Sequence, residues 1–348
     1  MKPTVLHILP HPGGGAESYI DALEPLPITM RRMPLSASRW PLSAVPSIVG
    51  RWPRVAVAAH RADLVHVHGD TTAMLVLPIM RHRASVLTTH GLHSLRRARG
   101  TRLVLVRGSL RLAVAAARRT ICTSEAEREE LSAFLPAVLR TRLLVVPNGA
   151  PPSSGITDRA RARAELGLAP DAVVALFVGE LEERKDPLTA VSAATAAVAA
   201  GARLVLLLAG AGSLADRVRA AAGPQVRVLG YREDTQTLLA ASDVLVMPSL
   251  WEGQSIAVLE AMREGLAVVV SDGPGNPELV GDAGEVVPVG DSGALAAVLV
   301  RLAADRVERR RLGAAAARRY EEHFSLERFQ QRMAALYGEL LDVRLDGA

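Results

Sequence analysis

The 348-residue chain contains a single cysteine, Cys122, and aromatic side chains make up only 3% of its residues. One thiol excludes an internal disulfide framework and favours a reducing compartment, so we expect a cytoplasmic location. The shortage of aromatic rings argues against a base-stacking platform and therefore against a nucleic-acid partner. Apolar runs stop short of the roughly 18 residues that a membrane-spanning helix needs. The first 30 residues also lack the layout of a secretory signal peptide.

The chain is rich in apolar residues, and its charge is unevenly distributed. Hydrophobic residues make up 49% and charged residues 22%, which is typical of a globular protein. The length suits two domains of roughly 150 residues each. The net charge is +11 over residues 1–150 and −6 over the remainder. A basic first half predicts an anionic surface or acceptor for the first domain only.

The stretch 244–263 carries the most informative pattern. The apolar run Val244 to Met247 predicts a buried parallel strand, a polar loop follows Pro248, and a helix is expected from Ile256 to Arg263. Backbone N–H groups at a helix start favour an anion such as a nucleotide phosphate. Glu252 lies in the loop, and Glu260 follows eight residues later, about two turns apart on a helical scale. A carboxylate is the usual acceptor for a ribose diol.

This Glu-x7-Glu arrangement, after Pro-Ser and before Ala-Met, resembles the signature of retaining GT-B glycosyltransferases, in particular glycosyltransferase family 4. Two surface glutamates on an ordinary strand–helix unit are the alternative. The resemblance implies an α/β protein with two doubly wound Rossmann-like domains facing a cleft. It also implies a C-terminal helix that crosses back to the first domain. We place the domains at residues 1–155 and 156–323, with the returning helix in 324–348.

A glycine-rich loop follows the first predicted strand, residues 4–9. Gly13, Gly14 and Gly15 allow the backbone to approach a ligand closely, although a plain tight turn would use the same residues. The loop is neither a Walker A loop nor a Gly-x-Gly-x-x-Gly motif. It resembles the Gly-Gly-x-Glu loop of family 4, which lines the sugar and acceptor site.

Two further predicted strands, 62–69 and 84–91, end in histidines. His66 and His68 alternate with apolar residues and point to one face, and we expect a structural role for His66. Ligands of open α/β sheets gather at the carboxyl ends of strands, which favours a functional role for His68. His90 resembles the histidine of the family's Thr-x-His tip, which approaches the donor sugar. His68 and His90 lack metal-ligand spacing, so no metal site is expected.

Eight arginines lie in residues 94–119 between apolar residues. This pattern predicts one or two basic amphipathic helices. Such a face is either solvated, or it contacts an anionic membrane peripherally through its arginines.

A strand over residues 173–178 opens the second domain, and Lys185 follows in the next loop. In the family an Arg and a Lys clamp the donor diphosphate here, and a diphosphate leaving group needs a cation if no metal is used. Glu180 stands where the Arg is usual. Either Arg184 replaces that Arg, or Glu180 turns away.

The resemblance implies sugar transfer from a nucleoside diphosphate sugar to a glycan, lipid-linked or small-molecule acceptor, with retention and without cofactor or required metal. Glu260 would bind the ribose, and Lys185 with Arg184 would neutralise the diphosphate. A GT-B nucleotide-sugar 2-epimerase and a catalytically weak scaffold subunit are the alternatives. The residues expected to carry catalysis are His90, Glu252 and Lys185. The residues expected to bind nucleotide or substrate are Gly13, Gly14, Gly15, Arg184, Lys185, Gly212, Tyr231, Arg232, Glu252, Gly253, Gln254, Ser255, Ile256 and Glu260.

Overall fold

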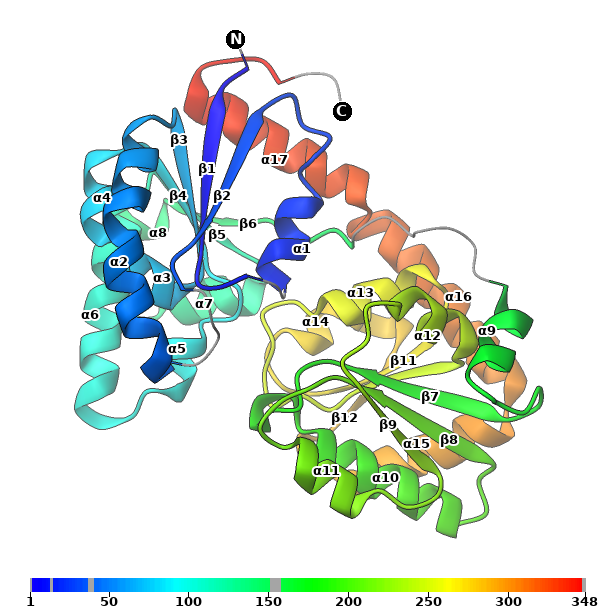
Figure 1. Cartoon of the computed structure of the whole chain (residues 1–348). Helices are drawn as coiled ribbons and strands as arrows, with labels where there is room; N and C mark the ends of the chain where they lie inside the picture. The colour runs from blue at the N-terminus through cyan, green and yellow to red at the C-terminus, as the bar shows by residue number, and fades with distance from the viewer. Residues whose placement is uncertain (1, 13–14, 37–40, 151–157, 346–348) are drawn as a thin grey trace. The chain divides into compact units, whose positions relative to one another are not determined.

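The computed structural model describes residues 2–12, 15–36, 41–150 and 158–345, with the side chains of 41–47 left out. The chain divides into two compact units, Met1–Pro151 with Leu326–Ala348, and Pro152–Ser325. Each unit is a six-stranded parallel sheet covered by helices (Figure 1). This is the α/β architecture that the sequence predicts. Of the predicted linker at 150–155, residues 151–155 lie outside the described residues.

The sheet of unit 1 has the strand order β2-β1-β3-β4-β5-β6, with all neighbours parallel. Its strands are β1 (Thr4–Leu9), β2 (Thr29–Pro34), β3 (Leu64–His68), β4 (Ser85–Thr88), β5 (Arg119–Cys122) and β6 (Leu143–Val145). Its helices are α1 (Gly15–Asp21), α2 (Pro41–His60), α3 (Asp70–Leu75), α4 (Leu77–His82), α5 (His93–Arg97), α6 (Gly100–Ala116), α7 (Glu125–Ser132), α8 (Ala137–Arg140) and α17 (Leu326–Leu341).

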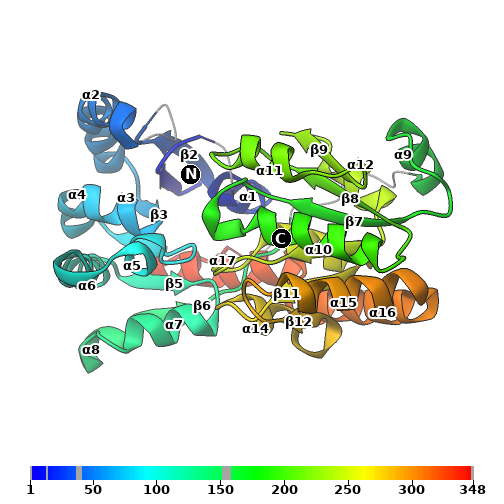
Figure 2. The same cartoon turned by 90° about the horizontal axis from the view of Figure 1, so that it is seen from below.

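Helices cover both faces of this sheet, so its central strands β3 and β4 are buried at every residue, including the polar residues His66, His68, Ser85 and Thr88. On one face, strand residues such as Leu6 and Val67 pack against α2, α3, α4 and α6. On the other face, Val5 and Leu64 pack against α1 and the last helix, α17. The α17 side chains buried in this core are Phe329, Met333, Leu336 and Tyr337. The chain therefore returns to complete its first unit, as the family resemblance implies (Figure 2).

The sheet of unit 2 has the order β12-β11-β10-β7-β8-β9, again with all neighbours parallel. Its strands are β7 (Val173–Val178), β8 (Leu204–Ala209), β9 (Val226–Gly230), β10 (Val244–Met247), β11 (Ala267–Ser271) and β12 (Glu285–Val287). Its helices are α9 (Arg159–Glu165), η1 (Glu183–Lys185), α10 (Pro187–Ala199), α11 (Ala215–Ala221), α12 (Thr235–Ala241), α13 (Ile256–Arg263), α14 (Asn276–Val280), η2 (Gly281–Ala283), α15 (Ser292–Ala304) and α16 (Arg306–His323).

Several helices begin where the sequence supplies a capping oxygen. A side-chain oxygen at the N-cap accepts a backbone N–H that the helix itself cannot satisfy. The capping residues observed are Ser124, Asp158, Asp186, Asp291 and Asp305.

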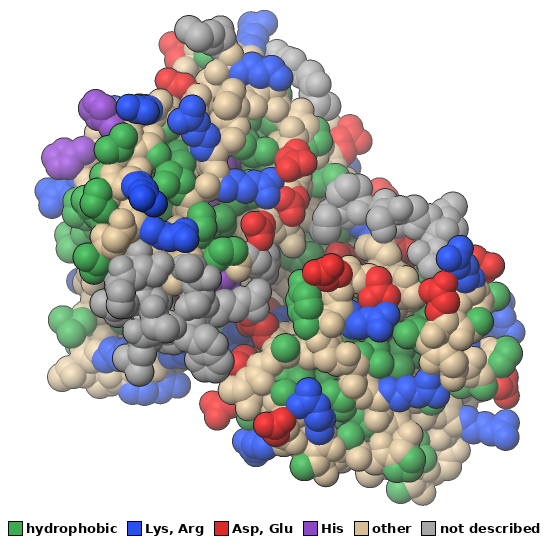
Figure 3. All heavy atoms as spheres, in the orientation of Figure 1, with side chains coloured by type: hydrophobic (Ala, Val, Ile, Leu, Met, Phe, Trp, Pro, Cys, Tyr) green, Lys and Arg blue, Asp and Glu red, His purple; other side chains and the backbone are tan. Residues whose placement is uncertain are grey.

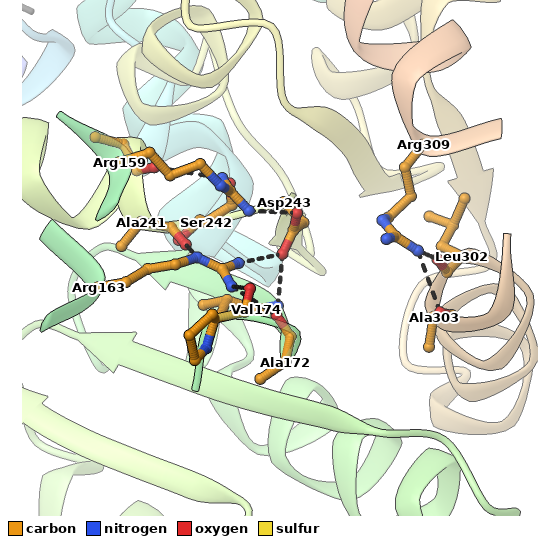
Figure 4. Close-up of polar contacts among 12 residues, drawn as sticks. Arg159, Arg163, Ala172, Val174, Ala241, Ser242, Asp243, Leu302, Ala303 and Arg309 are labelled. Atoms are coloured by element: carbon orange, nitrogen blue, oxygen red, sulfur yellow. Dashed lines mark hydrogen bonds and ion pairs between the residues drawn. The ribbon is translucent and has the colours of Figure 1, made fainter. Parts of the chain in front are cut away.

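An ion-pair network fastens α9 to the amino ends of the unit 2 strands (Figure 4). The Asp243 carboxylate accepts hydrogen bonds from Arg159 at 2.6 Å, Arg163 at 2.8 Å and the Val174 amide at 2.9 Å. Arg163 is buried and also donates to four backbone carbonyls, so its charge is fully partnered. Burial lowers the pKa of Arg163. The adjacent cavity of about 400 Å³, which Arg309 also lines, contains none of the predicted site residues.

Within the part of the chain that the structure describes, no helix combines the length and the apolar character that crossing a membrane requires.

Candidate functional site

The predicted loops of unit 2 meet at the point where the strand order reverses. From β7 the chain continues to β8 and β9 on one side of the sheet, and later to β10, β11 and β12 on the other. β7 and β10 are neighbouring parallel strands. The loops that follow them therefore both start at the carboxyl edge of the sheet and lead away to opposite sides. Open α/β sheets bind their ligands in the crevice at such a switch point.

Each of these two loops contributes charged side chains to one buried cluster. Lys185, at the end of η1 after β7, places Nζ 2.7 Å from Oε1 of Glu252, in the loop after β10. Arg184 places Nη1 2.8 Å from Oε2 of the same carboxylate. Lys185 and Glu252 are 8% and 5% exposed, so two cations share one anion out of bulk water.

Burial and pairing set the charge state of this cluster. Burial by itself raises the pKa of Glu252, but Arg184 and Lys185 overcome that effect and hold the pKa at about 2. Burial lowers the pKa of Lys185, and the Glu252 carboxylate opposes part of this shift. The cluster thus holds an ionised Glu252 between two basic groups beside the switch point.

Glu180, which stands where the family usually has an Arg, lies at the edge of this cluster. Its side chain is 44% exposed, and its carboxylate lies 3.6 Å from Arg184. Glu180 therefore sits at the margin, while Arg184, with 11% of its side chain exposed, reaches inward to Glu252. Arg184 and Lys185 therefore both contact Glu252, and the replacement of the family's arginine by Arg184 stays a prediction.

The loop after β11 fixes the position of Glu252. The Glu252 amide donates to the Pro274 carbonyl at 2.9 Å, and the Leu250 amide donates to the Arg184 carbonyl at 2.8 Å. Gly275 has φ +93° and lies so close that a Cβ on it would stand 2.6 Å from the Glu252 carbonyl oxygen. Only glycine fits there, because a side chain would push the Glu252 loop away.

Gly212 acts in a similar way on the loop that carries Lys185. A Cβ at Gly212 would stand 2.5 Å from the Leu181 carbonyl oxygen, which accepts the Leu214 amide at 2.8 Å. The Ser213 amide and hydroxyl both donate to Glu182 at 2.8 Å. The contacts observed for Gly212, predicted to bind nucleotide, are therefore with this neighbouring loop.

The start of α13 offers unsatisfied polar groups at the same edge. Ser255 is the N-cap residue, yet its hydroxyl makes no capping hydrogen bond. That hydroxyl is buried and has no hydrogen-bond partner among the described residues. Gly253 and Gln254 precede it in the loop, and Ile256 opens the helix. The first amides of a helix also lack intrahelical partners, so an anion would satisfy both kinds of group.

Glu260 lies one further turn along α13 and is half-buried. Burial raises its pKa to about 7, and Arg263 opposes this shift only in part. No described residue forms a hydrogen bond or an ion pair with its carboxylate. The carboxylate therefore keeps its full acceptor capacity for a ligand hydroxyl pair.

Tyr231 and Arg232 follow β9 at the same edge of the sheet. Tyr231 is 71% exposed. Arg232 donates from Nε and Nη2 to Asp234 at 2.7 and 2.5 Å. Neither side chain joins the Lys185–Glu252 cluster, and their expected role in binding nucleotide or substrate stays a prediction.

Unit 1 holds the other predicted residues. His90 lies just after β4 with φ +53°, a left-handed conformation that is uncommon for a residue with a side chain. Gly15 opens α1, whereas Gly13 and Gly14 lie outside the described residues. His66 bonds on both ring nitrogens, to Tyr337 Oη and Thr88 Oγ1, each at 2.6 Å. This pairing agrees with a structural role for His66.

The sequence reasoning missed His7. In the β1–β3 register His7 stands opposite His66, and its Nδ1 lies 3.0 Å from Nε2 of His68. One ring nitrogen from each of His7, His66 and His68 lies within 4.8 Å of the other two. Sequence spacing predicted no such cluster of histidines. The only available signal was a polar residue inside the apolar run 4–9.

Most arginines of the segment 94–119 are engaged by the protein itself. Arg96 pairs with Glu130 at 2.9 Å, and Arg119 pairs with Glu339 at 2.6 Å. The Arg107 and Arg111 guanidinium groups lie 5.5 and 6.0 Å from the Phe134 ring centroid. In the face drawn in Figure 3, basic side chains of unit 1 lie scattered among apolar ones.

The chain matches two sequence families. Residues 172–305 match the family described as Glycosyl transferases group 1, and residues 6–154 match Glycosyltransferase Family 4. The chain is 30% identical over 312 residues to the alpha-maltose-1-phosphate synthase of Mycobacterium tuberculosis, covering 81% of this chain and 80% of that protein. It is 29% identical over 261 residues to the UDP-Gal:alpha-D-GlcNAc-diphosphoundecaprenol alpha-1,3-galactosyltransferase of Escherichia coli, covering 70% and 67%.

Solved structures show the same arrangement of elements. Anabaena HepE in complex with UDP and glucose aligns with a TM-score of 0.78 at 20% identity, covering 96% of this chain and 99% of that chain. WaaG, a glycosyltransferase involved in lipopolysaccharide biosynthesis, aligns with a TM-score of 0.74 at 17% identity, covering 99% and 100%. These likenesses identify the two-unit α/β fold as GT-B.

Proposed function

This chain belongs to glycosyltransferase family 4 and is a glycosyltransferase; from that premise we propose that its second unit binds a nucleoside diphosphate sugar and that the sugar is transferred with retention at the anomeric carbon. The observation that carries this proposal is the convergence of Lys185 and Arg184 on Glu252 beside the switch point. The N–H donors of these two cations that Glu252 does not use can bind a diphosphate. This arrangement would neutralise the leaving group without a metal ion.

Each remaining group has a role in the proposal. The Ser255 hydroxyl and the first amides of α13 would receive the β-phosphate, with Glu252 fixing the donor sugar and the two cations. Glu260 would accept the two ribose hydroxyls. Uridine is the first base to test, because the Escherichia coli relative is named for UDP-Gal. His90 and the Gly13–Gly15 loop of unit 1 would contact the sugar or the acceptor.

The proposed reaction needs no enzyme nucleophile. The acceptor hydroxyl oxygen bonds to the anomeric carbon on the face from which the diphosphate departs. The bond between that carbon and the phosphate oxygen breaks, and the departing phosphate oxygen takes the acceptor proton. The enzyme then contributes positioning and positive charge rather than a covalent intermediate.

Substitution of Lys185 tests the proposal with a simple control, because the chain has only one other lysine, Lys2. Lys185→Ala should weaken donor binding by about tenfold or more, since it removes a charge-assisted hydrogen bond. Lys185→Arg should retain part of the affinity, and Lys2→Ala should retain all of it. Calorimetric titration with UDP-glucose measures these constants. Unchanged donor binding in Lys185→Ala would remove the basis of the proposal. A product that does not change when acceptor is added would instead favour the epimerase reaction.

We also propose that α6 of unit 1 contacts an anionic membrane surface. This helix has no acidic residue, and Val104, Leu105 and Leu112 on it are 70%, 71% and 55% exposed. Arg102 lies on the same helix with no ion pair among the described residues. Exposed apolar side chains beside a basic one favour the interface of anionic lipids.

Co-sedimentation with vesicles tests this contact. Wild-type protein should bind vesicles containing phosphatidylglycerol more strongly than vesicles of phosphatidylcholine alone. Leu105→Glu should lose most of that binding. Val307→Glu is the matched control, because Val307 is 78% exposed but lies on α16 of unit 2. Equal loss in the two variants would contradict a role for α6.

A further inference from the structure

Three histidines of unit 1 form one hydrogen-bonded chain. His7 Nδ1 lies 3.0 Å from His68 Nε2, and His68 Nδ1 lies 2.9 Å from His90 Nε2. His7 and His68 are fully buried, whereas His90 at the end of the chain is half-buried. The ring of His90 stacks on His68 at 5.2 Å and meets the edge of Tyr19 at 5.1 Å. These contacts fix the plane of the His90 ring.

The imidazoles of these three hydrogen-bonded histidines are neutral at physiological pH. Burial lowers the pKa of His7 to about 3 and that of His90 to about 4, and burial holds the pKa of His68 well below its usual value. A neutral imidazole carries one N–H donor and one acceptor nitrogen. Both links must therefore point the same way, either from His7 toward His90 or from His90 toward His7.

The free nitrogen of His7 decides between the two directions. Its Nε2 is buried and has no partner among the described residues. If the links ran from His90 to His7, that nitrogen would carry a proton, and a donor would be buried without an acceptor. If they run from His7 to His90, the same nitrogen is only an unused acceptor. Buried donors without acceptors are the rarer and costlier case, so the outward direction is favoured.

We propose that His7 and His68 are positioning residues that hold His90 in the Nδ1–H tautomer, as a hydrogen-bond donor to a ligand oxygen. His7 donates to His68, His68 donates to Nε2 of His90, and the remaining proton of His90 must sit on Nδ1. No described residue bonds that Nδ1. The proton is therefore available to a hydroxyl or phosphate oxygen of a sugar substrate, a ligand class that rests on the proposed function.

Nitrogen NMR of histidine side chains reads this tautomer directly. The chain has nine histidines, and a protein labelled with ¹⁵N only in histidine gives one pattern of long-range couplings for each. The signal of His90 is identified by its loss in His90→Gln. In the wild type without substrate, His90 should show the Nδ1–H pattern. The Nε2–H pattern at His90 would overturn the proposal, and this measurement needs no folded variant at His68.

Two substitutions at His68 then separate positioning from packing. Asparagine places an amide near the position of the histidine Nδ1 and can still donate to His90, whereas leucine cannot. His68→Leu should shift His90 to the Nε2–H form, which imidazoles prefer in water, and His68→Asn should not. An unchanged tautomer in His68→Leu would contradict the assigned link. Stoichiometric Zn²⁺ binding that shifts the signals of His7, His66 and His68 together would also overturn it.

Kinetics connects the tautomer to the reaction. His68→Leu should lower the turnover number about tenfold, and His68→Asn should restore most of the turnover. Equal turnover in His68→Leu and the wild type would contradict a positioning role. Because the tautomer is measured without substrate, the NMR experiment tests the tautomer assignment independently of whether UDP-glucose is the donor.

Discussion

The half-buried Glu260 gives a prediction whose magnitude follows from its pKa. With a pKa of about 7, the carboxyl is roughly one-tenth ionised at pH 6 and nine-tenths ionised at pH 8. If the ionised form accepts the ribose hydroxyls, donor binding must tighten as pH rises. The dissociation constant should fall by about tenfold between pH 6 and pH 8, which corresponds to about 1.4 kcal/mol.

Calorimetric titration with UDP-glucose at pH 6, 7 and 8 measures this effect. The nucleotide sugar is the right probe, because the terminal phosphate of free UDP itself ionises in this pH window. Binding at pH 7 should also release about half a proton, which a pair of buffers with different ionisation enthalpies reveals. His90, with a pKa of about 4, contributes no titration in this range.

Two substitutions on α13 and its C-cap complete the test. Glu260→Gln keeps an acceptor oxygen but cannot ionise, so its weaker binding should not depend on pH. Glu264→Gln alters the neighbouring carboxylate, which pairs with Arg263 at 3.0 Å, and should keep the pH dependence. A constant affinity in the wild type, or the same slope in Glu260→Gln, would refute the assignment of Glu260 to the ribose.

Three further predictions concern stability. The pKa of His7 is lowered from 6.5 to about 3 in the folded state, so the unfolded chain binds its proton first and stability falls with acid. Between pH 7.5 and 5.5 the wild type should lose about 1.4 kcal/mol more than His7→Asn in urea unfolding, and parallel losses would contradict this. Gly275→Ala should cost about 2 kcal/mol and weaken donor binding through the Glu252 loop, whereas Gly108→Ala, with nothing within 4 Å, should be tolerated. Equal unfolding midpoints for these two variants would rule out the close approach. Asp243→Ala should cost about 3 kcal/mol because it leaves Arg163 buried and unpaired, whereas Asp216→Ala, which breaks the exposed pair with Arg219, should cost under about 0.5 kcal/mol. Similar denaturation curves for both would show that the Asp243 network carries little energy.

The unit 2 site was accessible from the sequence because parallel strands bring their carboxyl ends to one edge. Apolar runs located β7 and β10, and the polar residues after them had to lie near each other once the sheet formed. Lys185 and Glu252 do meet there. The sequence could not show that Glu252 binds both cations in the absence of ligand, since that depends on side-chain reach across two loops.

The histidine chain was beyond sequence reasoning for a topological reason. His7 and His68 are far apart in the sequence. They meet only because β1 pairs with β3 on one side, as well as with β2 on the other. Apolar periodicity predicts strands but not the order in which they pair. Gly212 shows a second limit, because the sequence did not reveal how closely its backbone approaches the Leu181 carbonyl; its contact with nucleotide stays a prediction.

We propose that the Lys185–Glu252 cluster of unit 2 binds a nucleoside diphosphate without a metal ion. Titration of UDP, GDP and ADP into the wild-type protein in EDTA, followed by the same titrations with Mg²⁺, tests it most directly. We expect saturable binding of one nucleotide in EDTA, little changed by Mg²⁺. Binding of none of the three, or binding that appears only with Mg²⁺, would contradict it.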